Sequence, residues 1–456
     1  MKKNIPLLFI VINLFFSSCS VSNKINRTAN KEILNQPAFI NAFTGISIYE
    51  PATGKYWYNH HAEKYFTPAS NTKLATCYAA MKYLGDSLVG LRYKIVNGEV
   101  NIIGTGDPSF LLAEFKNQPV FDFLKKSTSI NYLLDGTTPG FTPLGEGWSW
   151  DDYLGDYAAE RSEMPIYGNV AKFYLDDDTI AVSPPFFYNQ FIKWNNAILK
   201  KRADKYFEIV RPFENDSFYT LHSPEMYLSK RAFTSQIIPF KTYLTPASHL
   251  RDQTVIKLLE DTLHKTIGEW SYVDAPPKIQ DYSIIHSQPT DSLLKPMMHR
   301  SDNFFAEQSL LMVSEKLLGT MNDRKIIDTL LKTDYKLMPQ KPGWVDGSGL
   351  SRYDLFSPKD FVFILNKMKN DFGMDRIKNI LPTGGTGTIS HYYLSDSGYI
   401  FVKTGTLNGV VALSGFLYTK KNKLLIFSVL INNHRSSATD IRKGIQKFIL
   451  QIRNKY

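Results

Sequence analysis

The sequence has only two cysteines, Cys19 and Cys77, so it cannot be a small domain held together by several disulfides. After the first 16 residues it also lacks any apolar run of about 20 residues, the length that a transmembrane helix needs. Its nine histidines include no H-E-x-x-H pair, which excludes that kind of zinc site. We therefore expect no metal and no cofactor.

Acidic residues are fewer than basic ones, and the formal net charge is +10. The lysines and arginines are scattered and accompany no nucleic-acid-binding motif, so we expect no nucleic acid partner. The positive charge indicates either attraction to an anionic polymer or membrane surface, or a general contribution to solubility. A length of 456 residues exceeds what one hydrophobic core usually serves, which predicts two or three domains.

Residues 1–19 are predicted to be a signal peptide. Two lysines at positions 2 and 3 precede an apolar stretch that is too short to span a bilayer. The run Phe16-Ser-Ser-Cys19 resembles a bacterial lipoprotein cleavage box, with Phe where Leu is usual, and this implies a lipid on Cys19. The alternative is an ordinary signal peptide that leaves a thiol. Both interpretations predict export, and the first predicts a periplasmic lipoprotein without an internal disulfide.

Beyond the leader, residues 20–38 are polar and aperiodic, which is typical of a tether. Residues 90–280 are β-rich and irregular. The pattern predicts an α+β catalytic domain at 39–89 and 281–456, interrupted by one or two inserted β-rich domains at 90–280. The expected elements are strands at 43–49, 56–58, 410–418 and 424–432, a helix from residue 70, and helices at 291–298, 304–318 and 439–454.

Ser70 and Lys73 form an S-x-x-K pair at the start of the first expected helix. A spacing of three places the hydroxyl and the amine on one face of a helix. A serine is a poor nucleophile unless a base takes its proton, and a lysine whose pKa is lowered by burial or a nearby cation can do so. Taken alone, the pair is weak evidence, because Ser70 could be a plain helix cap.

Ser301-Asp302-Asn303 lies in the expected turn between two helices. A hydroxyl there can pass a proton to a leaving amine, and a carboxamide can hold a substrate amide. The alternative is helix capping, since these three residue types favour N-caps and Glu307 could extend that role.

Lys403-Thr-Gly-Thr406 lies on an expected strand. A strand edge can bind an extended peptide by β-augmentation, and Gly405 allows close backbone approach. Lys403, Thr404 and Thr406 could then hold a carboxylate. The alternative is a strand with a surface lysine and a bulge.

Together the three motifs occur in the order found in penicillin-binding proteins and class A β-lactamases. The chain further resembles the D-alanyl-D-alanine carboxypeptidase/endopeptidase family, the low-molecular-mass class C penicillin-binding proteins, in which extra domains interrupt the catalytic one. This resemblance implies a serine β-lactamase/DD-peptidase-like domain, with an antiparallel sheet flanked by helices. The matching stretches are Thr67–Lys73, Gly104–Pro108, Gly147–Asp152, His299–Asn303 with Glu307, Asp346–Arg352 and Lys403–Thr406.

The resemblance also implies roles for single residues. Ser70 would be the nucleophile, Lys73 the general base and Ser301 the proton relay. Asn303 would orient the substrate amide, and Lys403 would tune the two catalytic groups electrostatically. The carboxylate would bind Thr404 and Thr406, and the N–H groups of Ser70 and Thr406 would form the oxyanion hole. The third residue of the peptidoglycan stem peptide would be read by Asp152, Tyr157, Arg352 and Asn408, unless Asp152 and Arg352 form a structural ion pair.

We therefore expect a DD-carboxypeptidase or DD-endopeptidase that acts on peptidoglycan stem peptides through an acyl-enzyme. β-Lactams should then be covalent inhibitors. Two alternatives keep the scaffold: a β-lactamase or esterase, against which the long insertion argues, and a non-catalytic wall-binding protein. The sequence does not fix the oligomeric state.

Overall fold

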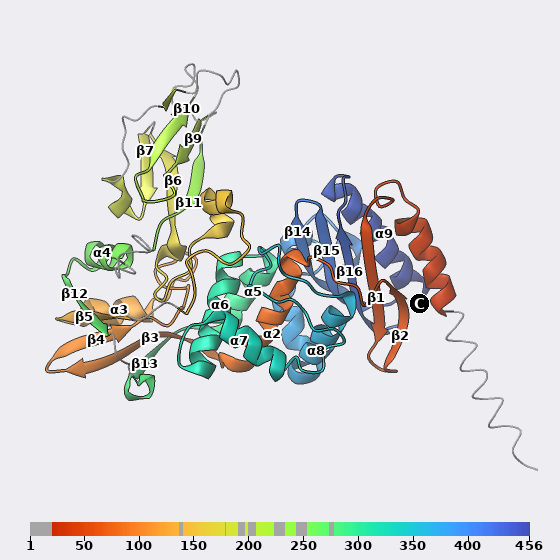
Figure 1. The fold of residues 1–456 in the computed structure, drawn as a ribbon, viewed down its shortest axis with the longest axis horizontal. Coiled ribbons are helices and arrows are strands. Elements are labelled where there is room, and N and C mark those ends of the chain that lie inside the picture. The colour runs from red at the N-terminus through yellow and green to blue at the C-terminus, as the bar shows by residue number, and fades with distance from the viewer. Residues whose placement is uncertain are drawn as a thin grey trace, which may run out of the picture. The chain divides into compact units, whose positions relative to one another are not determined.

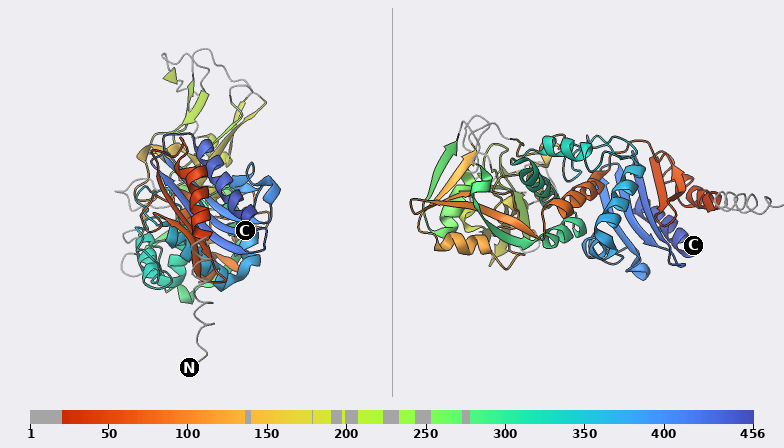
Figure 2. Two further views of the ribbon diagram at one scale, coloured as in Figure 1. Left: turned by 90° about the vertical axis from the view of Figure 1, so that its right-hand side faces the viewer. Right: turned by 90° about the horizontal axis from the view of Figure 1, so that it is seen from below.

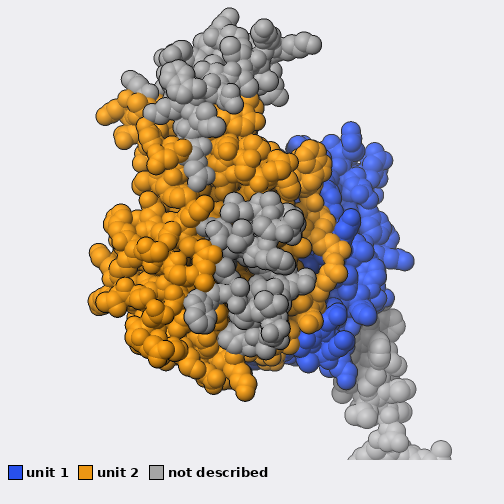
Figure 3. Space-filling view, turned by 60° about the vertical axis from the view of Figure 1, so that its left-hand side comes forward, with its two compact units in different colours: residues 1–78, 294–302, 327–456 blue, residues 79–293, 303–326 orange. Residues whose placement is uncertain are grey.

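The computed structural model describes residues 21–135, 140–177, 179–189, 197–198, 207–222, 233–242, 253–272 and 278–456. Cys19 and the rest of the leader lie outside these residues. The chain divides into two compact units, shown in different colours in Figure 3. The first comprises Met1–Tyr78, Leu294–Asp302 and Ile327–Tyr456, and the second comprises Ala79–Leu293 and Asn303–Ile326.

The first unit is built on an antiparallel sheet of five strands in the order β14-β15-β16-β1-β2. β1 pairs with β16, so that Ile46 lies opposite Val429 and the two ends of the chain share one sheet. β14 is an edge strand. The expected antiparallel sheet is therefore confirmed, and its strands are β1 (Phe43–Glu50), β2 (Lys55–His60), β14 (Ile400–Leu407), β15 (Val410–Tyr418) and β16 (Leu424–Asn432) (Figure 1).

Helices pack on this sheet according to the period-two alternation of its strands. Val411 and Leu413 of β15 belong to the core cluster that contains the apolar residues of α9 (Ala438–Lys455). Ser414 points to the other face, as alternate strand residues do, and accepts a hydrogen bond of 2.7 Å from Asn71 Nδ2. The long helix α8 (Pro358–Ile380) contacts β1, β15 and β16, as two further views in Figure 2 help to follow.

The segment expected to be a tether at 20–38 is helical over much of its length. Residues 21–29 form a helix that continues into a π-helical turn, η1 (Asn30–Leu34). Ile25, Ala29 and Ile33 are buried in the same core cluster as α9. Their spacing of four residues gives the helical segment one apolar stripe. The other residues of the segment are mostly polar, so its overall composition does not indicate a buried helix. These residues are therefore part of the first unit's core.

Three helices cross the division between the units: α2 (Lys73–Tyr83), α5 (Thr290–His299) and α7 (Asp323–Lys332). The second cysteine of the sequence, Cys77, is a buried free thiol within α2. None of the helices in the described part of the chain combines the length and the apolarity needed to cross a bilayer.

The second unit contains a five-stranded mixed sheet, in the order β12-β5-β4-β3-β13, and two three-stranded sheets, β11-β6-β7 and β8-β10-β9. The expected insertion at 90–280 lies inside this unit, which also includes α6 (Asn303–Leu318). Its other elements are β3 (Ser87–Val96), β4 (Glu99–Ile103), α3 (Pro119–Lys126), β5 (Ile130–Asp135), β6 (Val170–Asp176), β7 (Thr179–Ser183), β8 (Ala197–Ile198), β9 (Phe207–Val210), β10 (Tyr219–His222), β11 (Ser235–Pro239), α4 (Gln253–Leu263), β12 (Ile267–Tyr272) and β13 (Ser283–Pro289).

A buried charge cluster joins α6 to the rest of the second unit. Arg161 is 1% exposed, and its Nη1 lies 3.2 Å from Glu307 Oε2 and 2.8 Å from Asp323 Oδ2. The guanidinium also donates to the carbonyl oxygen of Thr142 at 3.0 Å. Glu307 is therefore an ion-pair partner inside the unit, in contrast to the capping role considered for it from the sequence.

Candidate active site

Ser70 lies in a 3₁₀ turn, η2 (Ala69–Thr72), that leads directly into α2. Lys73 is fully buried, and its Nζ lies 3.1 Å from Ser70 Oγ. The residue before the serine, Ala69, has φ of 48°, a left-handed conformation that costs energy in a residue with a Cβ. The turn therefore holds the hydroxyl next to the amine, as the S-x-x-K spacing predicts, in a strained backbone that the surrounding packing maintains.

A loop from a distant part of the sequence holds Lys73 from the other side. Lys73 Nζ donates to the carbonyl oxygen of Ser348 at 2.7 Å. The loop is shaped by the Asp346 carboxylate, which accepts hydrogen bonds from the N–H groups of Gly349 at 2.6 Å and Ser351 at 2.7 Å. This stretch is one of those on which the family resemblance rests. Its Asp-Gly-Ser-Gly composition is a signal for a turn closed by an aspartate side chain.

Lys403 and Ser301 form a second serine–lysine pair in the first unit. Lys403 is a buried residue of β14, and its Nζ donates to Ser301 Oγ at 2.8 Å and to the carbonyl oxygen of Thr404 at 2.7 Å. Ser301 lies between α5 and α6 with φ of 63°, again left-handed. The structure thus brings together two residues that are 102 positions apart.

The positive charge of Lys73 affects the protonation of Lys403. Burial lowers the pKa of the Lys403 amine well below its ordinary value, and the nearby positive charge of Lys73 lowers it further. Two amines in such a site behave as a coupled pair that loses its first proton more easily than an isolated lysine would. The pair therefore meets the condition for one amine to act as a base.

The β14 edge lies close to the serine turn. A Cβ placed on Gly405 would lie 2.6 Å from the carbonyl oxygen of Pro68 and 3.1 Å from Ala69 Cβ, so glycine is needed for this approach. On the same strand, Thr404 Oγ1 donates to Thr388 Oγ1 at 2.8 Å. Ser70 and the Lys403–Thr406 motif are therefore assembled within one unit.

Thr406, the last residue of that motif, is exposed, and its Oγ1 accepts a hydrogen bond of 2.8 Å from Arg442 Nη2 of α9. Sequence reasoning missed both Thr388 and Arg442. Thr388 ends the Gly-rich stretch 384–388, whose glycines are typical of a turn, and Arg442 lies in no motif.

Three of the expected residues belong to the second unit and lie together there. Asn303 Nδ2 donates to the carbonyl oxygen of Tyr157 at 2.9 Å, although the two are 146 positions apart. Tyr157 OH donates to Asp152 Oδ1 at 2.7 Å. Burial and this bond to the Asp152 carboxylate raise the pKa of Tyr157 to about 12. Asp152 thus has a tyrosine as its hydrogen-bond partner.

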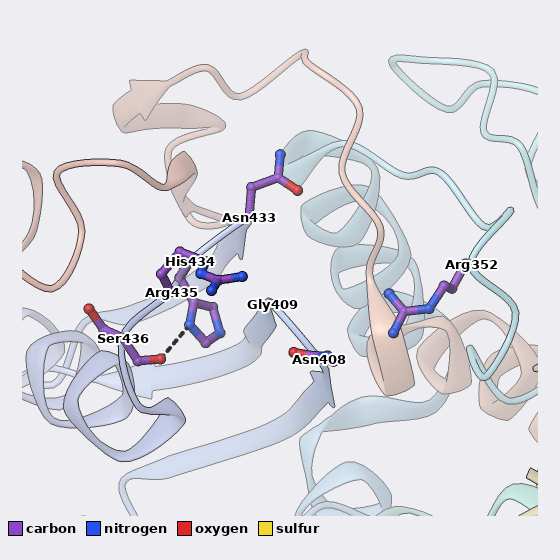
Figure 4. Close-up of a pocket in the computed structure, with 7 residues that line it drawn as sticks. All are labelled: Arg352, Asn408, Gly409, Asn433, His434, Arg435 and Ser436. Atoms are coloured by element: carbon purple, nitrogen blue, oxygen red, sulfur yellow. Dashed lines mark hydrogen bonds between the residues drawn. The ribbon is translucent and has the colours of Figure 1, made fainter.

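Arg352 and Asn408, the other two residues expected to read the stem peptide, line one pocket of the first unit (Figure 4). Its volume is about 680 Å³, and its remaining lining residues are Gly409, Asn433, His434, Arg435 and Ser436. No sequence signal pointed to the segment 433–436.

The geometry of the first unit suits acyl transfer. A hydroxyl at the start of a helix has a buried amine beside it, and a second hydroxyl has a second buried amine. An edge strand passes close to the first hydroxyl, where an extended peptide could pair with it.

Comparisons with known proteins agree with this chemistry. The model of the D-Ala-D-Ala carboxypeptidase 3 (S13) family matches residues 27–452. Penicillin-sensitive carboxypeptidase A of Dictyostelium discoideum is 24% identical, over 88% of this chain and 85% of its own length. D-alanyl-D-alanine carboxypeptidase DacB of Haemophilus influenzae is 25% identical, over 87% of each chain.

Solved structures show the same fold. Penicillin binding protein 4 from Haemophilus influenzae superposes with a TM-score of 0.69 at 19% identity, covering 94% of this chain and 98% of the other. A predatory peptidoglycan endopeptidase from Bdellovibrio bacteriovorus gives a TM-score of 0.52 at 13% identity, covering 91% and 93%. The family resemblance read from the motifs is confirmed: this chain belongs to the D-Ala-D-Ala carboxypeptidase 3 (S13) family and is a penicillin-binding serine DD-peptidase.

Proposed function

We propose that the enzyme cleaves D-alanyl-D-alanine-type bonds of peptidoglycan stem peptides through an acyl-enzyme on Ser70. The observation that carries this proposal is the pair of buried lysines, each within hydrogen-bond distance of a serine hydroxyl. Lys73 lies at 3.1 Å from Ser70 Oγ, within reach for direct proton transfer. The names of the carboxypeptidase relatives support the substrate class.

In the first step, Ser70 Oγ attacks the carbonyl carbon of the scissile amide and Lys73 takes the hydroxyl proton. The oxyanion that forms accepts hydrogen bonds from the N–H groups of Ser70 and Thr406, and one such donor contributes about 10²–10³ in rate. Ser301 gives its proton to the leaving amine of the terminal D-alanine and takes one in turn from Lys403, which donates a hydrogen bond to it. The C–N bond breaks, and an ester of Ser70 remains.

In the second step, water attacks the ester carbonyl and a proton returns to Ser70 as the C–O bond breaks. When the leaving amine belongs to a free D-alanine, the reaction is a carboxypeptidase reaction. When it belongs to a cross-linked peptide, it is an endopeptidase reaction. Digestion of purified muropeptides, with identification of the products, separates the two.

Intact-mass measurement after incubation with penicillin tests the acyl-enzyme. We expect a single adduct on the wild type, no adduct on Ser70→Ala, and almost none on Lys73→Ala with an unchanged circular dichroism spectrum. Cys77→Ser serves as a control that changes a buried side chain outside the two serine–lysine pairs. A folded wild-type protein without an adduct would refute the proposal. A long-lived penicillin adduct, with faster turnover of a D-Ala-D-Ala peptide, would distinguish the enzyme from a β-lactamase.

We further propose that the protein is exported to the periplasm and anchored by a lipid on Cys19. The support is the sequence of the leader, which ends in Phe-Ser-Ser-Cys. Labelling with radioactive palmitate in a bacterial host tests this. The wild type should be labelled and membrane-bound, and Cys19→Ser should be exported without label. Equal labelling of the two would contradict the proposal.

A further inference from the structure

The N-terminal helix of the first unit, residues 21–34 with its π-helical turn, has two faces of opposite character. The apolar residues that it buries in the core cluster shared with α9 are Ile25, Ala29 and Ile33. Three basic residues, spaced by three and four positions, are exposed: Lys24, Arg27 and Lys31. At about 3.6 residues per turn, the basic face lies opposite the buried one. The helix therefore presents a row of cations to solvent, on the side away from the core.

Two further segments bring positive charge to the same end of the first unit. Lys455 of α9 donates from its Nζ to Thr28 Oγ1 at 3.3 Å, so the end of α9 lies beside the N-terminal helix, as Figures 1 and 2 also show. The turn between β15 and β16 adjoins α9, because the N–H of Lys421 donates to the main-chain oxygen of Tyr456 at 3.1 Å. The exposed cations of these three segments are called the basic surface here, and they are Lys24, Arg27, Lys31, Lys420, Lys421 and Lys455.

The charge of the basic surface is largely uncompensated. Four of its members form no ion pair with any described residue, namely Lys24, Arg27, Lys420 and Lys421. Two acidic side chains of the adjoining segments are already paired. Glu32 lies 3.7 Å from Lys31 Nζ, and the buried Glu50 lies 3.1 Å from Lys423 Nζ. The terminal carboxylate offsets one more charge, so the surface as a whole remains positive.

The basic surface starts close to the residue that is proposed to carry a lipid. Residue 20 alone lies between Cys19 and the N-terminal helix, so a lipid on Cys19 would hold this end of the first unit against the bilayer. We infer that the basic surface binds the headgroups of anionic phospholipids and keeps this end of the first unit on the membrane. Each lysine or arginine near an anionic bilayer strengthens binding by about five-fold. The inference deepens the proposed anchoring, and its cations are present with or without the lipid.

Sedimentation with lipid vesicles tests the inference on the chain without its leader, residues 20–456, which keeps every described residue and carries no lipid. Vesicles of phosphatidylcholine and phosphatidylglycerol in equal parts should sediment the protein, whereas vesicles of phosphatidylcholine alone should not. Raising the salt from about 0.1 M to about 1 M should release it, because the Debye length falls from about 10 Å to about 3 Å. The triple variant Lys24→Gln, Arg27→Gln, Lys421→Gln should bind about a hundred-fold more weakly.

A second triple variant is the matched control, because it removes three exposed positive charges from α7 and the loop after it, also in the first unit. Its substitutions are Lys332→Gln, Lys336→Gln and Lys341→Gln. It has the same net charge as the first variant and should bind the anionic vesicles as the wild type does. All three proteins should form the penicillin adduct, which checks that they are folded. Equal binding by the two triple variants would overturn the inference, and so would a wild type that does not sediment with anionic vesicles.

Immobilised polyglutamate serves as a second probe, because it offers anionic groups without a bilayer. A wild type that polyglutamate retains and anionic vesicles do not sediment would show that the basic surface binds an anionic polymer, and the inference would be wrong. The penicillin adduct and the palmitate label on Cys19 are measured separately. Failure of the vesicle experiment therefore leaves both earlier proposals standing, and failure of either of those leaves the vesicle result interpretable.

Discussion

Lys73 and Lys403 are two buried amines whose charges oppose each other, and each contacts a serine hydroxyl. When one amine is protonated, the other loses its proton more easily, so the pair releases its first proton more easily than an isolated lysine would. The acylation rate should therefore rise with pH as the first proton leaves the pair, well below the ordinary lysine pKa.

Lys403→Met removes one of these charges and tests the coupling. With only one amine left, the repulsion that makes the pair release its first proton easily is gone. The rising limb of the acylation rate should then move to higher pH, and the maximal rate should fall because Ser301 loses its donor. Measuring penicillin acylation by mass between about pH 6 and pH 10 checks this prediction. A limb that stays in place would show that the two amines are not coupled.

Arg442 is predicted to position Thr406 through the hydrogen bond of 2.8 Å to its Oγ1. Arg442→Gln should lower kcat/KM by about ten-fold for a peptide with a free terminal carboxylate, since Thr406 is no longer oriented to bind it. The same peptide with a terminal amide should be affected much less. Lys443→Gln, a neighbouring charge removal, should change neither value. Equal losses for both peptides would indicate a merely structural role for Arg442.

At the residue scale, the sequence allowed us to predict the catalytic side chains of the three motifs. It did not allow us to predict most of the groups that hydrogen-bond to them. Ser70, Lys73, Ser301 and Lys403 carry distinctive chemistry at fixed spacings. The carbonyl oxygen of Ser348, by contrast, is a main-chain group with no side-chain signature, and it lies 275 positions from the lysine that it binds. Such partners depend on tertiary packing, which local patterns do not encode.

At the scale of secondary-structure elements, helix α8 begins with a capping box formed by Ser357 and Asp360. Ser357 accepts a hydrogen bond from the N–H of Asp360, and the Asp360 carboxylate accepts one of 2.8 Å from the N–H of Ser357 and one of 3.0 Å from that of Gln340. Burial nevertheless raises the pKa of Asp360 to about 6. Desolvation of the carboxylate therefore outweighs these hydrogen bonds.

This raised pKa predicts a pH-dependent stability. A carboxyl group whose pKa is higher in the folded protein binds more protons there, so its contribution to stability is full below the unfolded pKa of 3.8 and is lost as pH rises through about 6. The free energy of unfolding of the wild type, relative to Asp360→Asn, should fall by up to about 3 kcal/mol over this interval. Urea unfolding at several pH values measures it. Asp375→Asn, on the exposed side of the same helix, should show no such trend.

The sequence predicted elements correctly where it has long continuous apolar runs. The strands expected at 410–418 and 424–432 have the observed bounds of β15 and β16. Continuous apolar runs with a charged turn between them leave little choice of register or length. The helix at 21–29 and the π-helical turn after it were missed because only three buried apolar residues, spaced by four, distinguish them from a polar linker. Their stability comes from packing on α9, which cannot be read locally.

At the scale of the whole molecule, the second unit depends on a buried arginine. Arg161 has two carboxylate partners and almost no exposure, so replacing it by Met leaves Glu307 buried without its cation. Arg161→Met should lower the free energy of unfolding by about 3–5 kcal/mol, as measured by urea unfolding. Arg324→Met, which removes an exposed ion pair with Glu146, should cost less than about 1 kcal/mol. Comparable losses in the two variants would contradict this account.

The same cluster explains why domain boundaries were hard to predict. The sequence placed residues 303–326 in the catalytic domain, whereas the structure groups them with the second unit. Composition gives no indication of this, because the deciding contacts are long-range: Glu307 binds Arg161, and Gln308 Nε2 donates to the carbonyl oxygen of Gly106 at 2.8 Å. The β-rich insertion predicted at 90–280 therefore has other bounds than the second compact unit.

The packing of the helix at 21–29 in the core of the first unit limits how far the enzyme can extend from a lipid anchor on Cys19. If Cys19 carries the proposed lipid, Ser20 alone separates the anchored residue from a helix that is fixed by Ile25, Ala29 and Ile33. The linker is then one residue long, so the distance between the bilayer surface and Ser70 is bounded by the dimensions of the first unit. Only stem peptides within that distance would be cleaved, so inserting a flexible spacer after Ser20 should extend the reach of the enzyme without altering its chemistry.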